Sequence, residues 1–420
     1  MKKAMKLVSL VLAVVMLLGC LAACSSKSAT TDSTASTDTA STDTAASDSS
    51  EASSDGGEIV IALISNTTGD YAQYGQPVRD GAMLYINQLN ANGGINGKQV
   101  KVLEYDDKGD GVEAVNAYNL AKENGITAVI GSVLTGATIA LADATYEDNM
   151  PQVTASATAS GVTMIDPDDP DSEIRQNVFR ACFIDPYQGA AAATYAYENL
   201  GLRKAAVLMD MTNDYAVGLS SFFTRSFKKL GGEVVANLKY SSGDQDFTAQ
   251  LTELIAKKPE IVFMPAYFAE GAIIMKQARE LGATFRLMGA DAMDNPDTVK
   301  LAGKAAEGFL HTTFPYDAKM PNMSTEAKKF TEAWNKAYPE KETNVNGALG
   351  YNCLFLIVDA IKRANSAEPA AITKALAATK NLVTPLGTLT INASHDAEMP
   401  VGIIEYKDGK RVYLTEVTPK

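Results

Sequence analysis

Residues 59–107 read IVIALISNTTGDYAQYGQPVRDGAMLYINQLNANGGINGKQVKVLEYDD. Two apolar runs, 59–66 and 100–107, flank an amphipathic segment at 76–90 and a glycine-rich turn. Short apolar runs bounded by turn residues favour buried strands, and the segment between them has helical periodicity. Together they predict a strand, a helix and a second strand, which is the repeating unit of a doubly wound parallel sheet.

The same alternation continues along the chain. Strands are predicted at 126–133 and 151–156, and the pattern starts again after Asn177 with 178–183. Further strands are then expected at 204–210, 232–240, 260–265 and 285–290, followed by the segment 308–314. Helices are expected at 324–338 and 346–364, before the hairpin-like segments 386–392 and 401–417. We therefore predict an α/β protein with two doubly wound parallel-sheet lobes. Ligands of such folds bind beyond the carboxyl ends of the strands, in a cleft between the lobes.

We also predict the bounds of the two lobes. The first lobe is predicted to contain residues 58–183 and 312–384, and the second lobe residues 184–311 and 385–420.

The N-terminal segment has the features of an export signal. Lysines precede an apolar run at 7–18, which is shorter than the roughly 20 residues of a membrane-spanning helix. The letters LAAC (21–24) resemble the bacterial lipoprotein signal, which implies removal of residues 1–23 and acylation of Cys24. Cys20 is a weaker competing site, and an ordinary secretory signal is the alternative.

Residues 25–57 consist almost entirely of Ser, Thr, Ala, Asp and Gly. Such a composition cannot bury a core, so we expect a disordered linker between Cys24 and a folded body that begins at Glu58. The protein is then expected on the outer face of the bacterial cell membrane, held by its lipid anchor.

Charge and motif content limit the classes of function. The chain has 37 basic and 50 acidic residues, a net charge of −13, which argues against nucleic acid as a partner. His311 and His395 are its only histidines, and no nucleophile elbow, P-loop or H-E-x-x-H motif is present. We therefore expect binding without chemistry and without a cofactor, and an enzyme is the less favoured class.

Two acidic runs, 105–111 and 166–171, raise the possibility of a calcium site. The first run lacks the glutamate that completes an EF-hand loop, so both are interpreted as solvated turns and no metal is expected. Outside the signal, Cys182 and Cys353 are the only cysteines. Free buried thiols are expected there, and a disulfide between them is the alternative.

Several motifs in one order resemble a known family. They are G-x-x-A-Q-Y-G (69–75), G-A-x-x-x-I-N-x-x-N-x-x-G-G-I-N-G (81–97), Y-D-D (105–107), V-I-G-S (129–132) and S-A-T (156–158). This chain is similar over residues 58–310, and more weakly to its C-terminus, to the branched-chain amino-acid binding proteins of bacterial ABC importers. The resemblance implies the type I periplasmic-binding-protein fold, in which three crossovers join the lobes.

The resemblance also implies a binding site. The ligand carboxylate would be held at the ends of the third and fourth strands by Val133, Leu134, Thr135, Ser156 and Thr158. Unpaired amides at a helix N-terminus attract an anion without a cationic side chain, which agrees with that role. Plain turn capping is the alternative for these residues.

In GADAMDN (289–295), Asp291 matches the position of the family's carboxylate for the ligand ammonium group, where glutamate is more common. Asp294 is the substitute candidate, and a capping role is the alternative for Asp291. The cleft lining would include Tyr74, Tyr215 and Tyr267, with possible contributions from Tyr71 and Phe268, although each could be merely packed.

One family feature is missing. Well-known members have a small disulfide near the ligand, but its positions here are Lys108 or Gly109 and Leu134, so that bridge cannot form. The resemblance implies a monomeric solute-binding lipoprotein that delivers leucine, isoleucine or valine to an ABC permease, whose ATPase is another chain. The alternatives are a receptor for an amide, urea or an aromatic acid, and a ligand sensor for a signalling receptor.

Overall fold

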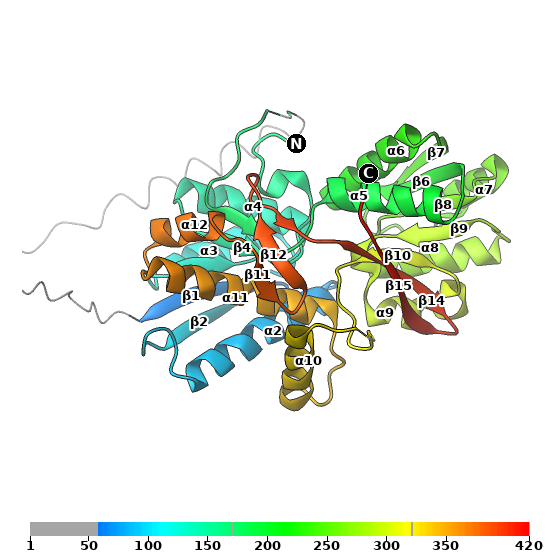
Figure 1. The fold of residues 1–420 in the computed structure, drawn as a ribbon. Helices are drawn as coiled ribbons and strands as arrows, with labels where there is room; N and C mark the ends of the chain where they lie inside the picture. Colours follow the sequence, from blue (N-terminus) through cyan, green and yellow to red (C-terminus); the bar gives the residue numbers. More distant parts are fainter. Residues whose placement is uncertain (1–57, 168, 170, 321, 420) are drawn as a thin grey trace, which may run out of the picture. The chain divides into compact units, whose positions relative to one another are not determined.

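Three sheets organise the residues that the computed structural model describes, which are 58–167, 169, 171–320 and 322–419 (Figure 1). The predicted signal, Cys24 and the linker lie outside these residues. No helix among the described residues is long and apolar enough to cross a membrane.

The first sheet is entirely parallel. Its strands, in spatial order, are β2 (Val100–Asp106), β1 (Ile59–Ser65), β3 (Ala128–Ile130), β4 (Gln152–Thr154) and β5 (Val178–Arg180). Its helices are α2 (Ala72–Ala91), α3 (Gly111–Lys122), α4 (Thr135–Glu147), α11 (Val345–Ala364) and α12 (Pro369–Ala377). Strand β1 is buried throughout, because its alternate side chains pack on opposite sides: Ile61 lies in one cluster with α2 and α11, and Ala62 in another with α3 and α4.

The second sheet continues the α/β pattern. Its strands, in spatial order, are β15 (Lys410–Val417), β14 (Val401–Lys407), β10 (Leu310–Thr313), β9 (Arg286–Gly289), β8 (Ile261–Phe263), β6 (Lys204–Asp210) and β7 (Glu233–Tyr240). Strands β6 to β10 are parallel to one another, and the C-terminal hairpin β14–β15 adds to β10 in antiparallel fashion (Figure 1). Its helices are α5 (Asp185–Thr194), α6 (Asp214–Lys229), α7 (Thr248–Lys257), α8 (Phe268–Glu280) and α9 (Pro296–Ala302).

The chain passes between the first and second sheets three times: after β5, after β10 and before β14. The second passage contains α10 (Thr325–Ala337). This is the predicted α/β architecture with parallel-sheet lobes and three crossovers.

The strand predicted after Asn177 belongs to the first sheet, because β5 pairs in parallel with β4. This pairing is consistent with the assignment of residues 58–183 to the first lobe. The tail, in contrast, divides: β12 (Gly387–Ile391) and β13 (Ala397–Glu398) pair with β11 (Leu382–Thr384) in a third sheet rather than joining the second.

The third sheet is joined to the first lobe through β5. Arg180 pairs with Asp396 at 2.6 Å, and both side chains are buried. His395 also lies with its ring against Phe179, 4.1 Å between centroids. Residues 385–398 therefore lie beside the first sheet, and we propose that only the chain from Pro400 onward returns to the second lobe.

Close helix packing in the first lobe depends on glycine. A Cβ on Gly81 of α2 would lie 1.9 Å from the carbonyl oxygen of Gly347, and one on Gly350 of α11 would lie 1.9 Å from that of Val78. These backbones can approach only because no side chain stands between them.

Gly81→Ala is expected to lower the free energy of unfolding by about 1–3 kcal/mol, because the clash with backbone outweighs the better helix propensity of alanine. Urea unfolding measures this. Gly136→Ala is the matched control, because a Cβ there meets nothing within 4 Å. Equal stability of both variants would contradict the packing argument.

Candidate functional site

A cavity of about 30 Å³ lies between elements of the two lobes. Its lining residues are Tyr74, Val133, Leu134, Thr135, Ser156, Tyr215, Tyr267, Asp291, Ala292 and Asn346. The structure thus gathers every predicted ligand residue except Thr158 around one space. Asn346 and Ala292 were not predicted.

The first-lobe side of this cavity contains the N-terminus of α4. Leu134 precedes the helix and makes no side-chain cap, and the first helical hydrogen bond runs from Thr138 N to the Leu134 carbonyl at 2.9 Å. The amides of residues 135–137 therefore have no acceptor within the helix. Ser156 Oγ donates to the Val133 carbonyl at 3.1 Å and joins this loop to the end of β4. The arrangement suits a carboxylate.

Thr158 lies behind this side of the cavity. Its side chain is fully buried, its Oγ1 has no hydrogen-bond partner, and its carbonyl accepts from Asp185 N at 2.9 Å. It is absent from the cavity lining because the chain turns inward after Ser156, toward the start of α5.

Asp291 supplies the carboxylate on the second-lobe side. Its Oδ1 accepts from Tyr215 Oη at 2.9 Å and from Gln188 Nε2 at 2.7 Å. Desolvation by the surrounding protein raises the pKa of Asp291 to about 6, although both hydrogen bonds favour the charged form. Asp291 is therefore largely ionised at neutral pH and lies across the cavity from the α4 N-terminus.

Aromatic rings form the remaining wall. The rings of Tyr215 and Tyr267 are stacked, with centroids 5.7 Å apart, and Tyr74 is tilted against Tyr267 at the same distance. Tyr74 also joins the lobes: its hydroxyl donates to the Ala292 carbonyl at 2.7 Å and accepts from Phe268 N at 3.1 Å.

The two supplementary aromatic candidates lie outside the lining. Tyr71 packs on Tyr267 at 4.8 Å and donates to Glu270 Oε1 at 3.0 Å, while Phe268 packs edge-on against Tyr74. Both support the wall from behind.

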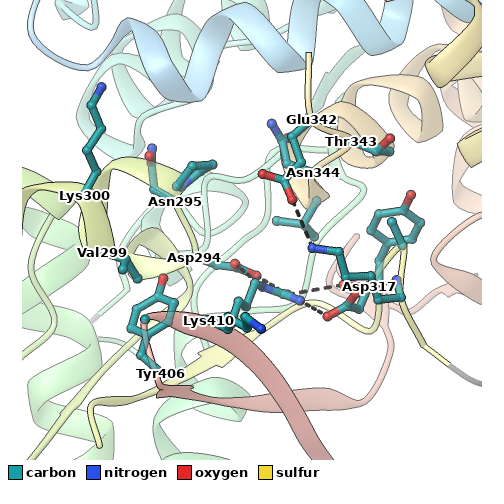
Figure 2. A pocket seen from close by; sticks show the side chains of 17 residues that line it. Asp294, Asn295, Val299, Lys300, Asp317, Glu342, Thr343, Asn344, Tyr406 and Lys410 are labelled. Carbon is teal, nitrogen blue, oxygen red and sulfur yellow. Dashed lines mark hydrogen bonds and ion pairs between the residues drawn. The ribbon is translucent and has the colours of Figure 1, made fainter. Parts of the chain in front are cut away.

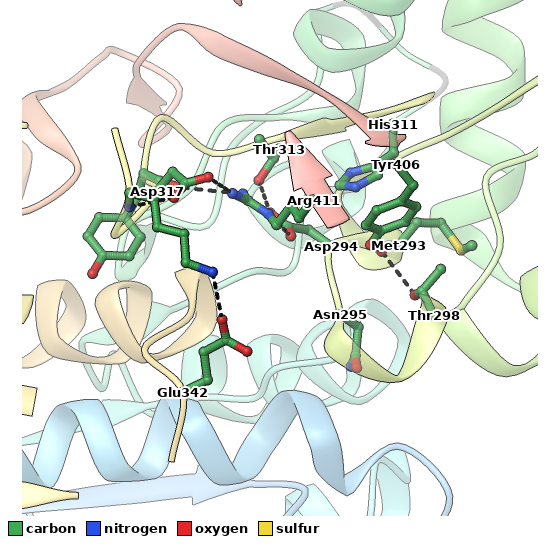
Figure 3. A network of polar contacts seen from close by, with 12 residues as sticks. Met293, Asp294, Asn295, Thr298, His311, Thr313, Asp317, Glu342, Tyr406 and Arg411 are labelled. Carbon is green, nitrogen blue, oxygen red and sulfur yellow. Dashed lines mark hydrogen bonds and ion pairs between the residues drawn. The ribbon is translucent and has the colours of Figure 1, made fainter. Parts of the chain in front are cut away.

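Asp294, the substitute for Asp291, is already paired. Arg411 on β15 binds both of its carboxylate oxygens at 2.7 Å, and Thr313 Oγ1 donates to it as well (Figure 3). Burial alone raises the pKa of Asp294, but the Arg411 charge outweighs it and holds that pKa below its usual value. Arg411 also binds Asp317 in the second crossover.

A wider cavity of about 450 Å³ adjoins this network (Figure 2). Figure 2 shows Asp294, Asp317 and Lys410 beside it, together with Asn295 and Lys300 from α9 and the segment before it. None of the nine predicted ligand residues lines it, so it is separate from the candidate site.

The segment 105–111 is a partly exposed turn, and its one buried carboxylate supports the ligand loop. Asp107 is fully buried and accepts from Ser132 Oγ and from Gly109 N, whereas Asp110 caps α3. A Cβ on Gly109 would lie 2.7 Å from Cδ1 of Leu134, so the two positions of the family disulfide are adjacent but filled by a leucine side chain. Within the described part of the second acidic run, Asp169 Oδ1 accepts from Asp171 N.

The two cysteines among the described residues are free, as predicted. Cys182 and Cys353 are both fully buried, and burial raises the pKa of both thiols. They serve as small apolar core residues.

Two polar residues behind the site were missed, and both lie in the first turn of α5. Gln188 contacts Asp291 directly, and Asp185 is fully buried with no hydrogen-bond partner on either carboxylate oxygen. The sequence gives one signal: DPYQ places two polar side chains in the first turn of a helix that follows a crossover.

Asp185→Asn is expected to stabilise the protein more at pH 8 than at pH 5. Burial raises the pKa of Asp185 well above its usual range, so ionisation costs folding free energy as pH rises, and an amide removes that cost. Urea unfolding at both pH values measures the difference. A gap between variant and wild type that does not widen with pH would contradict this interpretation.

Comparisons with known proteins identify the family of this chain. The family model described as periplasmic binding protein matches residues 58–411. A Leu/Ile/Val-binding protein homologue of Brucella melitensis is 32% identical and covers 86% of this chain and 95% of its own. A leucine-, isoleucine-, valine-, threonine- and alanine-binding protein of Pseudomonas aeruginosa is 29% identical over 80% of this chain and 87% of its own.

Solved structures resemble the fold as well. The leucine-binding protein LivK of Thermotoga maritima superposes with a TM-score of 0.79 at 34% identity, over 86% of this chain and 99% of its own. The substrate-binding protein LivJ of Streptococcus pneumoniae, in complex with isoleucine, gives 0.78 at 28% identity, over 86% and 100%. Because the family model spans most of the chain, this protein belongs to the periplasmic binding protein family, with the type I fold.

Proposed function

We propose that the protein is an extracytoplasmic solute-binding protein for a free amino acid, with leucine, isoleucine or valine as the first candidates. The observation that carries this proposal is the placement of opposite electrostatic poles across one cavity: the unpaired amides of α4 on one side and Asp291 on the other. A zwitterion has a group of opposite charge for each pole: a carboxylate for the amides and an ammonium group for Asp291.

In the proposed complex, the carboxylate accepts hydrogen bonds at the α4 N-terminus, including Thr135, with Ser156 beside it. The ammonium group binds Asp291, and the ligand side chain lies against Tyr74, Tyr215 and Tyr267. The cavity of about 30 Å³ holds little more than a water molecule or two. The lobes must therefore open for entry and close over the ligand, which requires tighter binding by the closed state.

The resemblance to importer components supports further proposals. The closed form is delivered to an ABC permease, whose ATPase is a separate chain, and the protein acts as a monomer without catalysing a reaction. Cys24 anchors it through lipid to the outer face of the cell membrane, and residues 25–57 form the linker. Neither a cofactor nor a metal takes part in the proposed binding.

Thermal unfolding with a panel of ligands tests the ligand class. Leucine, isoleucine and valine are expected to raise the melting temperature by mass action, whereas acetamide, urea and benzoate are not. Protein that has been unfolded and refolded avoids interference from retained ligand. A shift with benzoate, acetamide or urea but with no amino acid would contradict the proposal.

A further inference from the structure

Gln188 lies directly behind Asp291. It is fully buried in α5, and its Nε2 donates to Asp291 Oδ1 at 2.7 Å and to Thr312 Oγ1 on β10 at 2.7 Å. Its Oε1 is buried without a partner. The amide of Gln188 therefore donates one N–H to the carboxylate of Asp291 and the other to Thr312, while its oxygen remains without a hydrogen-bond partner.

A hydrogen bond donated to Asp291 Oδ1 stabilises the ionised carboxylate more than the neutral carboxyl group. Tyr215 donates to the same Oδ1, so the two donors hold one oxygen and neither contacts Oδ2. Asp291 lines the cavity, whereas Gln188 does not.

We propose that Gln188 is a positioning residue that holds Asp291 ionised, with Oδ2 turned toward the ligand, and so sets the pH below which the site loses its amino acid. The proposal rests on the proposed function, because it assigns the ammonium group to Asp291. Thr312 acts behind Gln188 by fixing its amide.

The surroundings of Asp291 make such a donor necessary. No cation pairs with Asp291 among the described residues, and burial pushes its pKa up to about 6. The titratable groups that face it come from several elements, and all are acidic or neutral in kind: Cys182, Asp185, Tyr74, Tyr215, Tyr267 and Asp294. Hydrogen-bond donors must therefore stabilise the charge in place of a basic side chain.

The test measures leucine affinity between pH 5 and pH 8.5 in wild type and in Gln188→Met, which has a similar shape but no donor. Wild-type affinity is expected to fall below about pH 6. In Gln188→Met the fall should begin about one pH unit higher, so that the loss at pH 5.5 exceeds that of wild type by about five- to ten-fold, while the two differ little at pH 8.5.

Gln277→Met is the matched control, because Gln277 is a second-lobe amide that binds Phe247 N and the Gln245 carbonyl instead. The midpoint pH at which Gln277→Met loses its leucine affinity should equal that of wild type. If Gln188→Met does not fold, Thr312→Val takes its place and is expected to move the midpoint in the same direction by a smaller amount.

Three results would overturn the proposal. An unchanged midpoint in Gln188→Met, or an equal loss at every pH, would reduce Gln188 to a packing residue while leaving amino-acid binding by wild type intact. Failure of wild type to bind any amino acid would overturn the proposed function itself, and this inference with it.

Discussion

Asp291→Ala is expected to weaken leucine binding by roughly ten- to a hundred-fold at pH 7. A hydrogen bond to a charged group contributes about 1.5–3 kcal/mol, and each 1.4 kcal/mol corresponds to ten-fold in affinity. The same change should leave a ligand that has no ammonium group almost unaffected. Calorimetric titration of the refolded protein measures both effects.

Asp297→Asn is the control for Asp291→Ala. Asp297 lies six positions along the same segment and pairs with the exposed Lys300 on α9, outside the cavity lining. The Asp297→Asn variant should bind leucine as tightly as wild type does. Full affinity in Asp291→Ala would remove Asp291 from the site, and an equal loss in both variants would show a general effect of charge on the segment.

Arg411→Met is expected to lower the free energy of unfolding by about 3–5 kcal/mol. Its guanidinium group is the partner of two carboxylates, Asp294 and Asp317, whose side chains are only 7% and 11% exposed. Removing one member of a buried pair leaves an uncompensated charge, which is the costly case. Urea unfolding at pH 8 provides the measurement.

The pH dependence of this loss follows from Asp294. Its pKa is depressed in the folded state, so the pair stabilises the fold above the unfolded pKa near 4 and loses that contribution as pH falls further. The deficit of Arg411→Met should therefore be largest near neutrality and shrink in acid. Lys410→Met, at the exposed neighbouring position, should stay within about 0.5 kcal/mol of wild type at every pH. Similar deficits in both variants would contradict the role of Arg411.

The sequence predicts the α/β architecture because its signals are local. Strand β6 occupies 204–210 as predicted, and the predicted helices at 324–338 and 346–364 correspond to α10 and α11. Strand β3 ends earlier than expected, at Ile130, because Gly131 has a φ of 142° and the chain leaves the sheet there. That early exit forms the loop around Val133 and Leu134.

Contacts between residues far apart in the chain could not be predicted from the sequence. The contact between Arg411 and Asp294 joins residues 117 positions apart, and nothing in either segment marks it. The pairing of β5 with β4 could not be predicted, because the sequence of an isolated strand does not identify its neighbour. The pairing of residues 387–398 in the third sheet could not be predicted for the same reason.

The candidate site shows the same division. Residues at strand ends and helix starts, such as Thr135 and Tyr215, could be placed because parallel strands bring their carboxyl ends together. Thr158 could not be distinguished from Ser156, since both are hydroxyls two positions apart after β4. Gln188 was hidden because its role depends on Asp291, 103 residues away.

Calorimetric titration tests amino-acid recognition most directly. The wild-type protein is first unfolded and refolded, and it is then titrated with leucine and with the deaminated acid of leucine. The two ligands share the carboxylate and the side chain and differ in the ammonium group. We expect leucine to bind at least about ten-fold more tightly, because only leucine can use Asp291. Equal affinities, or binding of the deaminated acid alone, would contradict recognition of an amino acid between the α4 N-terminus and Asp291.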